Sequence, residues 1–305
     1  MGGGMRRVLT SLLRIPGEAL HRHSRRFTRR VNRVLRRDVS IVSRFLPYRP
    51  ADRNWVLPLD DPRPDPTPLP APPPPLWLGY GRSLDAYLET GRRDVDAMRA
   101  VLANSGLDIA ACSRILDLGC GAGRMLRWLV DFAPEREIWG TDVSAEHILW
   151  CQRHLSPPFR FVTTTSCPHL PFEDRYFDLV YAGSVFTHIS ELADAWLLEI
   201  RRVLRPGGAA YLTVHDRRTI ELLEQNPQRP LARRLSALPP DLRFWQQDFG
   251  MFTIERGFGS LVFYDDRFIR RHWSRFFDVS AIVPEAYDFQ TAVLLQKPVA
   301  SAPTS

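Results

Sequence analysis

The sequence predicts an α/β protein built on a doubly wound, mostly parallel β-sheet. Short apolar runs with strand character alternate with longer helical stretches, which is the order of elements that a parallel sheet requires. The first run, Ile115 and Leu116, leads into a turn with glycine at alternate positions and then into the helix-forming stretch MLRWLV. A strand, a glycine turn and a helix in that order predict a ligand site at the turn, because glycine permits positive φ and close approach.

The residues around the turn indicate whether the ligand is anionic or cationic. Asp117 precedes Gly119, Gly121 and Gly123, and Arg124 follows them. The dinucleotide fingerprint G-x-G-x-x-G would need a glycine at the position of Arg124. An acid just before the turn also disfavours a pyrophosphate at the helix N-terminus. A cationic ligand is therefore favoured.

The segment ILDLGCGAGR, residues 115–124, resembles the E/D-x-G-x-G-x-G signature of class I S-adenosylmethionine-dependent methyltransferases. The resemblance implies that S-adenosyl-L-methionine is the cofactor and that Asp117 binds the amino group of its methionine. It also implies that the residues of the turn lie under the cofactor: Gly119, Cys120, Gly121 and Gly123.

A second acid follows at the spacing that a nucleoside requires. The short strand 137–141 ends at Asp142, which lies 23 residues after Gly119. A carboxylate at a strand tip can accept hydrogen bonds from both hydroxyls of a ribose, each worth roughly 1.5–3 kcal/mol. We therefore expect Asp142 to bind the cofactor ribose, although an acid at a strand end can also cap a helix.

Two later blocks resemble the same family. Residues 170–189 contain a buried strand and a loop that enters a helix, and residues 199–216 contain a helix that Pro206-Gly207-Gly208 ends before another strand. Four further segments resemble one bacterial subgroup of the small-molecule and glycan type: SLDAYLETGRRDVDAMRAVL, GRMLRWL, ILWCQRHL and SVFTHIS.

One position departs from the family. Many relatives have an acid a few residues before the LPF motif, where it binds the adenine amino group, but this chain has Thr165-Ser166-Cys167. Adenine recognition would then use neutral groups or backbone. Ser166 and Ser184 are the further candidate cofactor-binding residues.

The resemblance implies a seven-stranded Rossmann-like sheet whose last strand is antiparallel. The strands are expected at 114–118, 137–141, 159–163, 177–182, 209–214, 277–283 and 290–296, with a helix over 266–277. Residues 217–262 would be an insertion above the carboxyl ends of the strands, where α/β folds bind ligands. Five aromatic residues of the insertion either shape an acceptor pocket or pack on one another: Phe244, Trp245, Phe249, Phe252 and Phe258.

The rest of the chain divides by composition. Residues 1–50 hold 13 arginines against Glu18 and Asp38, a net charge of +11, so the rest of this +7 chain carries about −4. Ten of the 18 residues from Pro58 to Pro75 are proline, which predicts an extended linker over 51–76. We expect a methyltransferase domain over 77–297 and a disordered tail over 298–305.

Within the arm, residues 24–46 have the pattern of a basic amphipathic helix, because apolar residues recur at three- and four-residue steps between arginines. Three interpretations stay open. The helix docks on the catalytic domain, lies on an anionic membrane surface, or binds nucleic acid. Its aromatic residues lie on the apolar face, which makes nucleic acid the less favoured partner.

The remaining composition predicts a cytoplasmic protein, with membrane association through the arm as an alternative. No run approaches about 18 continuous apolar residues, and the apolar stretch near the start is broken by Arg14 and Pro16. Four cysteines show neither C-x-x-C spacing nor a histidine at a zinc-site interval, so no metal site is expected.

The predicted function is methyl transfer to a small-molecule or glycan acceptor, most simply to an oxygen. His188, six residues after the fourth strand, is the candidate base, and His215, after the fifth strand, is a weaker candidate. The fourth strand lacks the [DN]-P-P-[YF] element used on amide or adenine nitrogen. RNA methylation through the arginine-rich arm and a non-catalytic scaffold of the same fold are the alternatives.

Overall fold

The computed structural model describes residues 69–255 and 260–299. The predicted basic arm, most of the proline-rich linker, Phe258 and residues 300–305 lie outside the described residues. Within the described ranges, no helix combines the length and the apolar content needed to cross a bilayer.

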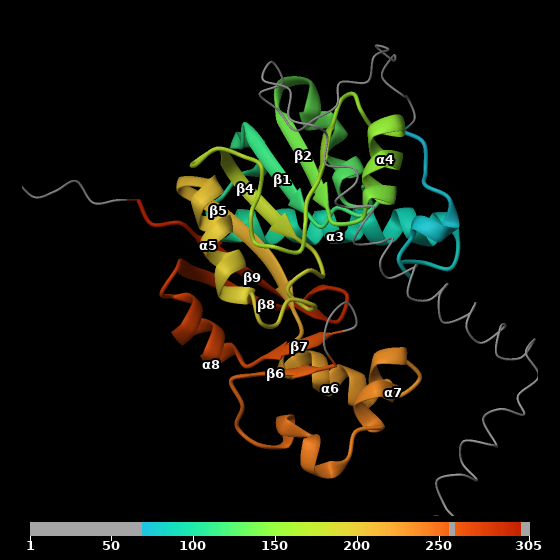
Figure 1. The fold of residues 1–305 in the computed structure, drawn as a ribbon, viewed down its shortest axis with the longest axis vertical. Helices are drawn as coiled ribbons and strands as arrows, with labels where there is room; N and C mark the ends of the chain where they lie inside the picture. Colours follow the sequence, from blue (N-terminus) through green and yellow to red (C-terminus); the bar gives the residue numbers. More distant parts are fainter. Residues whose placement is uncertain (1–68, 256–259, 300–305) are drawn as a thin grey trace, which may run out of the picture. The chain divides into compact units, whose positions relative to one another are not determined.

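A seven-stranded sheet forms the centre of the described domain, in the order β3-β2-β1-β4-β5-β9-β8 (Figure 1). Strands β1 to β5 are parallel, whereas β9 runs antiparallel to both of its neighbours. The predicted doubly wound sheet with a terminal antiparallel hairpin is confirmed. The strands are β1 Arg114–Leu118, β2 Glu137–Asp142, β3 Arg160–Thr163, β4 Phe177–Ala182, β5 Leu204–Val214, β8 Asp278–Tyr287 and β9 Gln290–Gln296.

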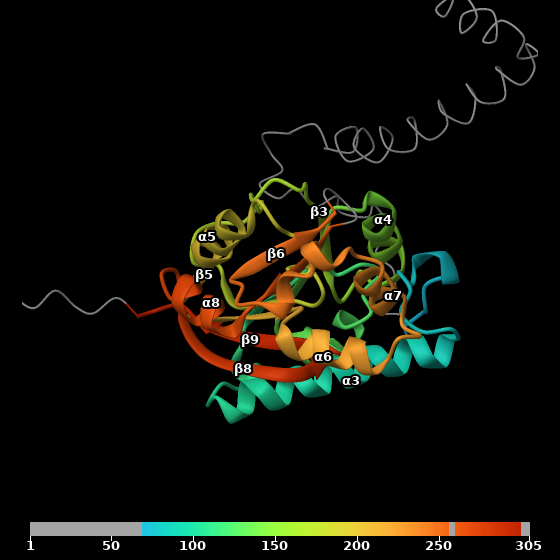
Figure 2. The ribbon, with the colours of Figure 1, turned by 90° about the horizontal axis from the view of Figure 1, so that it is seen from below.

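Helices cover both faces of the sheet. Helices α3 (Leu84–Asn104) and α4 (Ala145–His154) pack on one face, and α5 (Ala193–Val203) packs on the other, opposite α3 (Figure 2). The predicted helix from Asp266 is α8 (Asp266–Phe268), which continues as a π-helix (Ile269–Trp273) on the α5 side.

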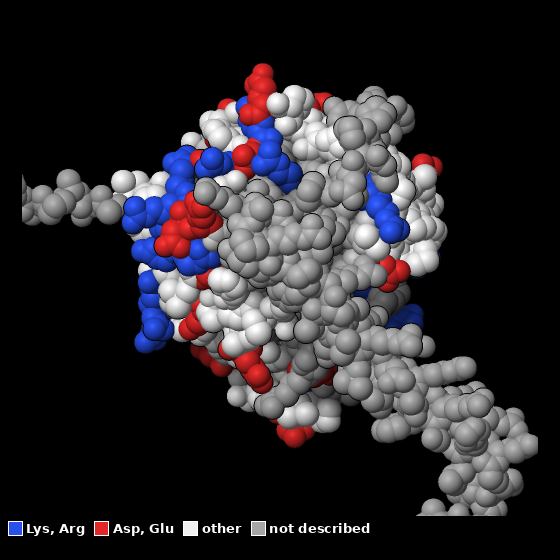
Figure 3. Space-filling model, turned by 45° about the horizontal axis from the view of Figure 1, so that its top comes forward, with Lys and Arg blue, Asp and Glu red and all other residues white. Residues whose placement is uncertain are grey.

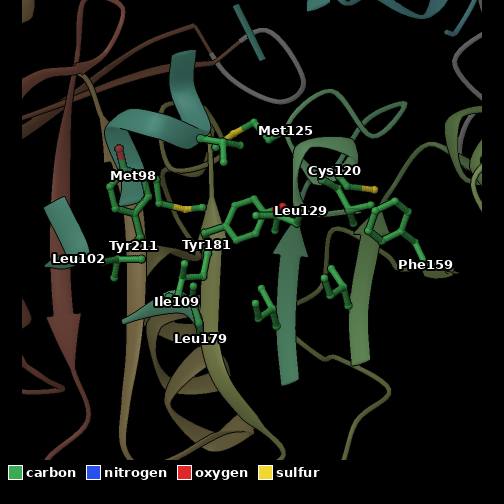
Figure 4. Close-up of a cluster of buried hydrophobic side chains, with 14 of the residues drawn as sticks. Met98, Leu102, Ile109, Cys120, Met125, Leu129, Phe159, Leu179, Tyr181 and Tyr211 are labelled. Atoms are coloured by element: carbon green, nitrogen blue, oxygen red, sulfur yellow. The ribbon is translucent and has the colours of Figure 1, made fainter. Parts of the chain in front are cut away.

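Successive side chains of each strand point to opposite faces of the sheet, and this alternation produces two hydrophobic cores. In β4, Leu179 and Tyr181 join the α3-side core, whereas Val180 and Ala182 join the α5-side core. Figure 4 shows side chains of α3, β4 and β5 meeting in the first of these cores. A sheet buried on both faces explains why its strands read as continuous apolar runs.

Two local predictions differ from the structure. The stretch after the glycine turn is a 3-10 helix, Leu126–Glu135, and not the start of an α-helix. Helix α5 ends at Val203, so Pro206-Gly207-Gly208 lies inside β5, where the pairing with β4 is irregular. Gly207 has a φ of +76°, which allows the strand to continue through that irregularity.

Residues 217–255 and 260–264 form a small unit that we call the insertion subdomain. It contains α6 (Arg217–Gln225), α7 (Pro230–Ser236) and a hairpin of β6 (Met251–Ile254) and β7 (Leu261–Tyr264). It follows the carboxyl end of β5 directly, in the part of the chain where the sequence predicts the insertion 217–262.

The aromatic residues of the insertion subdomain pack mainly on one another. Trp245 and Phe252 are buried with Phe263 of β7, Phe249 packs against this cluster, and the Phe252 and Phe263 rings stack 4.9 Å apart. Phe244 is 47% exposed. Of the two interpretations of these aromatic residues, the structure favours the self-packed core.

Gly91 lies at the point where α3 packs against the residues that follow the glycine turn. The carbonyl oxygen of Arg124 lies too close to the position that a Cβ atom on Gly91 would take, and Trp128 Nε1 lies 3.0 Å from that position. Helix propensity alone would make Gly91→Ala stabilising by about 1 kcal/mol. We expect the opposite, a loss of about 1–3 kcal/mol in the free energy of unfolding, because overpacking must displace the turn.

Urea denaturation of the wild type and Gly91→Ala measures the sign of this change. Ala100→Gly, at an exposed position of the same helix, calibrates the propensity term. A stabilised Gly91→Ala protein would show that α3 and the turn can separate without cost.

Candidate active site

The candidate site lies where the sheet changes direction. The strand order runs outward from β1 to β3 on one side and from β4 to β5 on the other, and ligands bind at such a switch point. The glycine turn follows β1, and the loop 183–188 follows β4. Val185 of this loop occupies the space that a side chain on Gly119 would need, so the two segments lie in contact.

The glycine turn has the conformation that its sequence predicts. Gly119, Gly121 and Gly123 have φ values of +82°, +53° and +73°. The backbone amides of Gly119 and Cys120 donate to the carbonyl of Thr141 at 2.7 and 2.9 Å, which fixes the turn against the end of β2. A side chain at these positions would strain the backbone.

Asp142 stands at the tip of β2 beside this turn. One carboxylate oxygen accepts from the Gly121 amide at 2.8 Å, and the other accepts from the Ser144 amide at 2.7 Å. Each oxygen retains further acceptor capacity. Asp142 forms no salt bridge with a described residue, so its carboxylate fits the pair of ribose hydroxyls that the sequence predicts as its ligand.

Asp117 is an acid buried inside the domain. Its side chain is 3% exposed, and the Tyr181 hydroxyl donates to it at 2.9 Å. Burial raises the pKa of Asp117 to about 8. Because no described residue forms an ion pair with it, Asp117 can accept a cationic ligand group, as the amino group of a bound methionine would be.

Cys120, Ser166 and Ser184 occupy different surroundings. Cys120 is buried, and burial raises the pKa of its thiol well above the ordinary value, which fits a passive place in the turn. Ser166 is exposed in the loop after β3. Ser184 has a φ of +58°, and its hydroxyl accepts from Gln290 Nε2 at 2.9 Å. A cofactor contact remains a prediction for all three.

The sequence shows Arg124 only as the residue that stands where the dinucleotide fingerprint would have a glycine. In the structure it is buried, its guanidinium lies 2.8 Å from Asp94, and it lies 3.9 Å from the ring centre of Tyr80. It also donates to the Tyr287 hydroxyl. These partners lie 30 or more residues away in the chain, so no local pattern could reveal them.

Residues 69–81, which we call the N-terminal strap, lie across the glycine turn. Arg127 donates to the carbonyls of Leu69 and Pro70 at 2.7 Å each, and His147 Nε2 lies 3.2 Å from the carbonyl of Leu76. Leu78 Cδ1 is 3.3 Å from the position of a Cβ on Gly121. The last part of the predicted linker, residues 69–76, is therefore part of the folded domain.

His188 has the geometry of an oriented base. Its Nδ1 lies 2.8 Å from the carbonyl oxygen of Ser260. A carbonyl only accepts, so Nδ1 carries the proton and Nε2 of the neutral ring carries the lone pair. Nε2 makes no hydrogen bond to the described residues, and the ring is on a loop whose Val185 contacts the glycine turn.

His215 lies in an apolar environment. The residue is 3% exposed, and its ring packs against the rings of Phe263 and Phe289, at centroid distances of 5.0 and 5.8 Å. Burial lowers its pKa to about 3. A buried imidazole that resists protonation is a weak base, so the geometry favours His188.

Comparison with known proteins supports a common family. Residues 116–212 match the family model described as a methyltransferase domain. The chain is 32% identical over 125 residues to malonyl-acyl-carrier-protein O-methyltransferase of Geobacter sulfurreducens, covering 41% of this chain and 45% of that protein. It is 31% identical over 153 residues to trans-aconitate 2-methyltransferase of an Azoarcus species, covering 49% and 58%.

The chain thus spans about half the length of the curated relatives it matches, between 45% and 58% for these two. Among solved structures, it aligns with the PH0226 protein of Pyrococcus horikoshii at 21% identity and a TM-score of 0.48. That alignment covers 67% of this chain and 89% of the other.

Asp117 should make stability depend on pH. Its folded pKa of about 8 lies above its ordinary value of about 3.9 in an unfolded chain. The neutral carboxyl therefore contributes stability that is fully present below about pH 4 and is lost as the pH rises toward 8. When the pH is raised from 5 to 8, the free energy of unfolding of wild type should therefore fall by about 2–4 kcal/mol relative to that of Asp117→Asn, which does not titrate at this position.

Urea denaturation of both proteins at the two pH values tests this expectation. The comparison between proteins removes the contribution of all other titrating groups. A difference between wild type and variant that is the same at pH 5 and pH 8 would contradict a raised pKa at Asp117.

Proposed function

Because the chain belongs to the class I S-adenosylmethionine-dependent methyltransferases, we propose that it is an enzyme that methylates a hydroxyl oxygen of a small molecule or glycan. S-adenosyl-L-methionine supplies a methyl group already activated on a sulfonium. In the transfer, the bond from sulfur to the methyl carbon breaks, a carbon–oxygen bond forms, and the hydroxyl loses its proton.

The observation that carries this proposal is the placement of two acids around one glycine turn. Asp142 accepts from the amide of Gly121 and faces the turn from β2, and buried Asp117 precedes the turn on β1. One acid suits a ribose diol and the other a cation, so the pair fits the two ends of one nucleoside-linked amino acid.

The chain supplies positioning and a proton acceptor. Held geometry can lower the barrier of a bimolecular transfer by roughly 7–11 kcal/mol. His188 Nε2 takes the hydroxyl proton in our proposal, since its lone pair is left free by the bond at Nδ1. The N-terminal strap lies over the turn and would keep water from the bound methionine.

Two observations support oxygen as the methylated atom. Ala182-Gly183-Ser184-Val185 follows β4 in place of [DN]-P-P-[YF]. The relative from Geobacter sulfurreducens is named an O-methyltransferase. The presence of both Asp117 and Asp142 disfavours the alternative that the protein is a non-catalytic scaffold of the same fold.

The surface charge of the described domain gives less support to an RNA acceptor. Figure 3 shows basic side chains gathered on one side of the visible face, with acidic side chains among them. On the described surface, Arg202 pairs with Asp174 at 2.8 Å, and Arg205 pairs with Asp178. An RNA acceptor, membrane contact through residues 24–46 and a cytoplasmic location remain predictions from the sequence.

Labelled methyl transfer tests the function and the base together. The full chain is incubated with labelled S-adenosylmethionine and extracts of small molecules and glycans. We expect a base-stable O-methyl product from wild type and a rate about 10²–10⁴-fold lower from His188→Ala. His169→Ala, whose side chain is 80% exposed, is the matched control and should keep the wild-type rate.

Equal product formation by wild type and His188→Ala would exclude His188 as the base. Transfer only to RNA would replace the proposed acceptor class. Failure of all extracts and of RNA to accept label from a protein that binds the cofactor would reject the proposed activity.

A further inference from the structure

The insertion subdomain is hydrogen-bonded directly to the loop that carries His188. The Val262 amide donates to the carbonyl of Thr187 at 2.9 Å, and the Tyr264 hydroxyl donates to the carbonyl of Ile189 at 3.3 Å. Strand β7 thus runs beside residues 187–189. These two segments are more than 70 residues apart in the chain, so only the fold brings them together.

Ser260 makes two bonds to His188 at this junction. Its hydroxyl donates to the His188 carbonyl at 2.6 Å, and its own carbonyl accepts from His188 Nδ1 at 2.8 Å. One residue therefore holds both the backbone and the ring of the histidine. Ser260 is 2% exposed, so water does not compete for its hydroxyl.

The other end of the loop is held from β9. Gln290 Nε2 donates to the Ser184 hydroxyl at 2.9 Å, and Gln290 Oε1 accepts from the Thr213 hydroxyl at 2.7 Å. The Ser184 amide in turn donates to Thr213 Oγ1 at 2.6 Å. These bonds fix the backbone near the glycine turn, but none of them reaches the His188 ring.

The orientation of the ring therefore depends on Ser260. Among the described residues, the Ser260 carbonyl is the only hydrogen-bond partner of the His188 imidazole. If residue 260 moves, Nδ1 loses its acceptor and the proton can move to Nε2. A ring with the proton on Nε2 has no lone pair there to accept a hydroxyl proton.

We propose that Ser260 is a positioning residue for the transfer reaction, which holds His188 in the tautomer that leaves Nε2 free. The inference rests on the proposed role of His188 as base. It also assigns a purpose to the insertion subdomain. Its aromatic residues pack into a core of their own, and that core supports β7 and with it Ser260.

Nitrogen NMR of the full chain labelled at histidine reads the tautomer directly. In wild type, the neutral His188 ring is expected to carry its proton on Nδ1. Ser260→Ala keeps the backbone carbonyl but removes the hydroxyl bond that holds residue 260 against His188. The carbonyl should then shift from Nδ1, and a mixture of both tautomers is expected. Ser260→Thr keeps a hydroxyl and should restore the wild-type spectrum.

Kinetics on the acceptor found in the labelled screen give a second readout. Ser260→Ala should lower kcat about 10-fold or more, while KM for S-adenosylmethionine stays within about twofold, because only the base is displaced. Ser236→Ala is the matched control. Ser236 also lies in the insertion subdomain and donates its hydroxyl to a backbone carbonyl, that of Ala232, at 2.9 Å.

The outcomes separate this inference from the proposed function. A wild-type spectrum with the proton on Nε2 would overturn the inference even if Ser260→Ala did not fold. An unchanged tautomer and kcat in Ser260→Ala, in a protein whose His188→Ala variant is inactive, would overturn the role of Ser260 alone. Full activity of His188→Ala would instead remove the base from the proposed function.

Discussion

Close backbone approach at the glycine turn is the constraint on which the rest of the site depends. Helix α3 reaches the turn because Gly91 leaves room for the carbonyl of Arg124, and the loop after β4 reaches it because Gly119 leaves room for Val185. The Gly121 amide then bonds to Asp142. Three elements thus contact the turn directly, and a side chain at Gly91 or Gly119 would push α3 or the loop after β4 away from it.

This packing explains why the two acids behave differently. Asp142 lies at a strand tip and has two backbone amides as partners, so its carboxylate is held in one orientation. Asp117 lies one strand away without an ion-pair partner among the described residues, and burial raises its pKa. A cationic ligand would favour its ionised form, so ligand binding and proton release are coupled at this position.

Much of the fold could be predicted from the sequence because local signals specify it. Ile115 and Leu116 form a buried strand, the alternate glycines have positive φ, and Asp142 lies beside the turn as its spacing indicates. Other features depend on distant partners. Arg124 pairs with Asp94, which is 30 positions away, and two hydrogen bonds join Ser260 to His188, which is 72 positions away. Neither composition nor local spacing predicts these pairs.

In the insertion subdomain, the sequence could not decide between two environments for the same aromatic residues. Phe252 and Trp245 could line a pocket or fill a core with equal ease on sequence grounds, because both environments favour aromatic side chains. Their packing against Phe263 decides between the two. Similarly, Pro206-Gly207-Gly208 predicts a break, but the pairing partner in β4 turns that break into an irregularity within a strand.

Calorimetric titration of the full chain with S-adenosylmethionine measures whether Asp142 and the glycine turn bind this cofactor. We expect saturable binding by wild type and binding at least about 10-fold weaker by Asp142→Ala, since the ribose loses charge-assisted hydrogen bonds. Asp96→Ala, an exposed acid on α3, should bind as wild type does. Equal affinity of wild type and Asp142→Ala would show that Asp142 does not bind the ribose, and no binding by wild type would show that the turn is not a site for this cofactor.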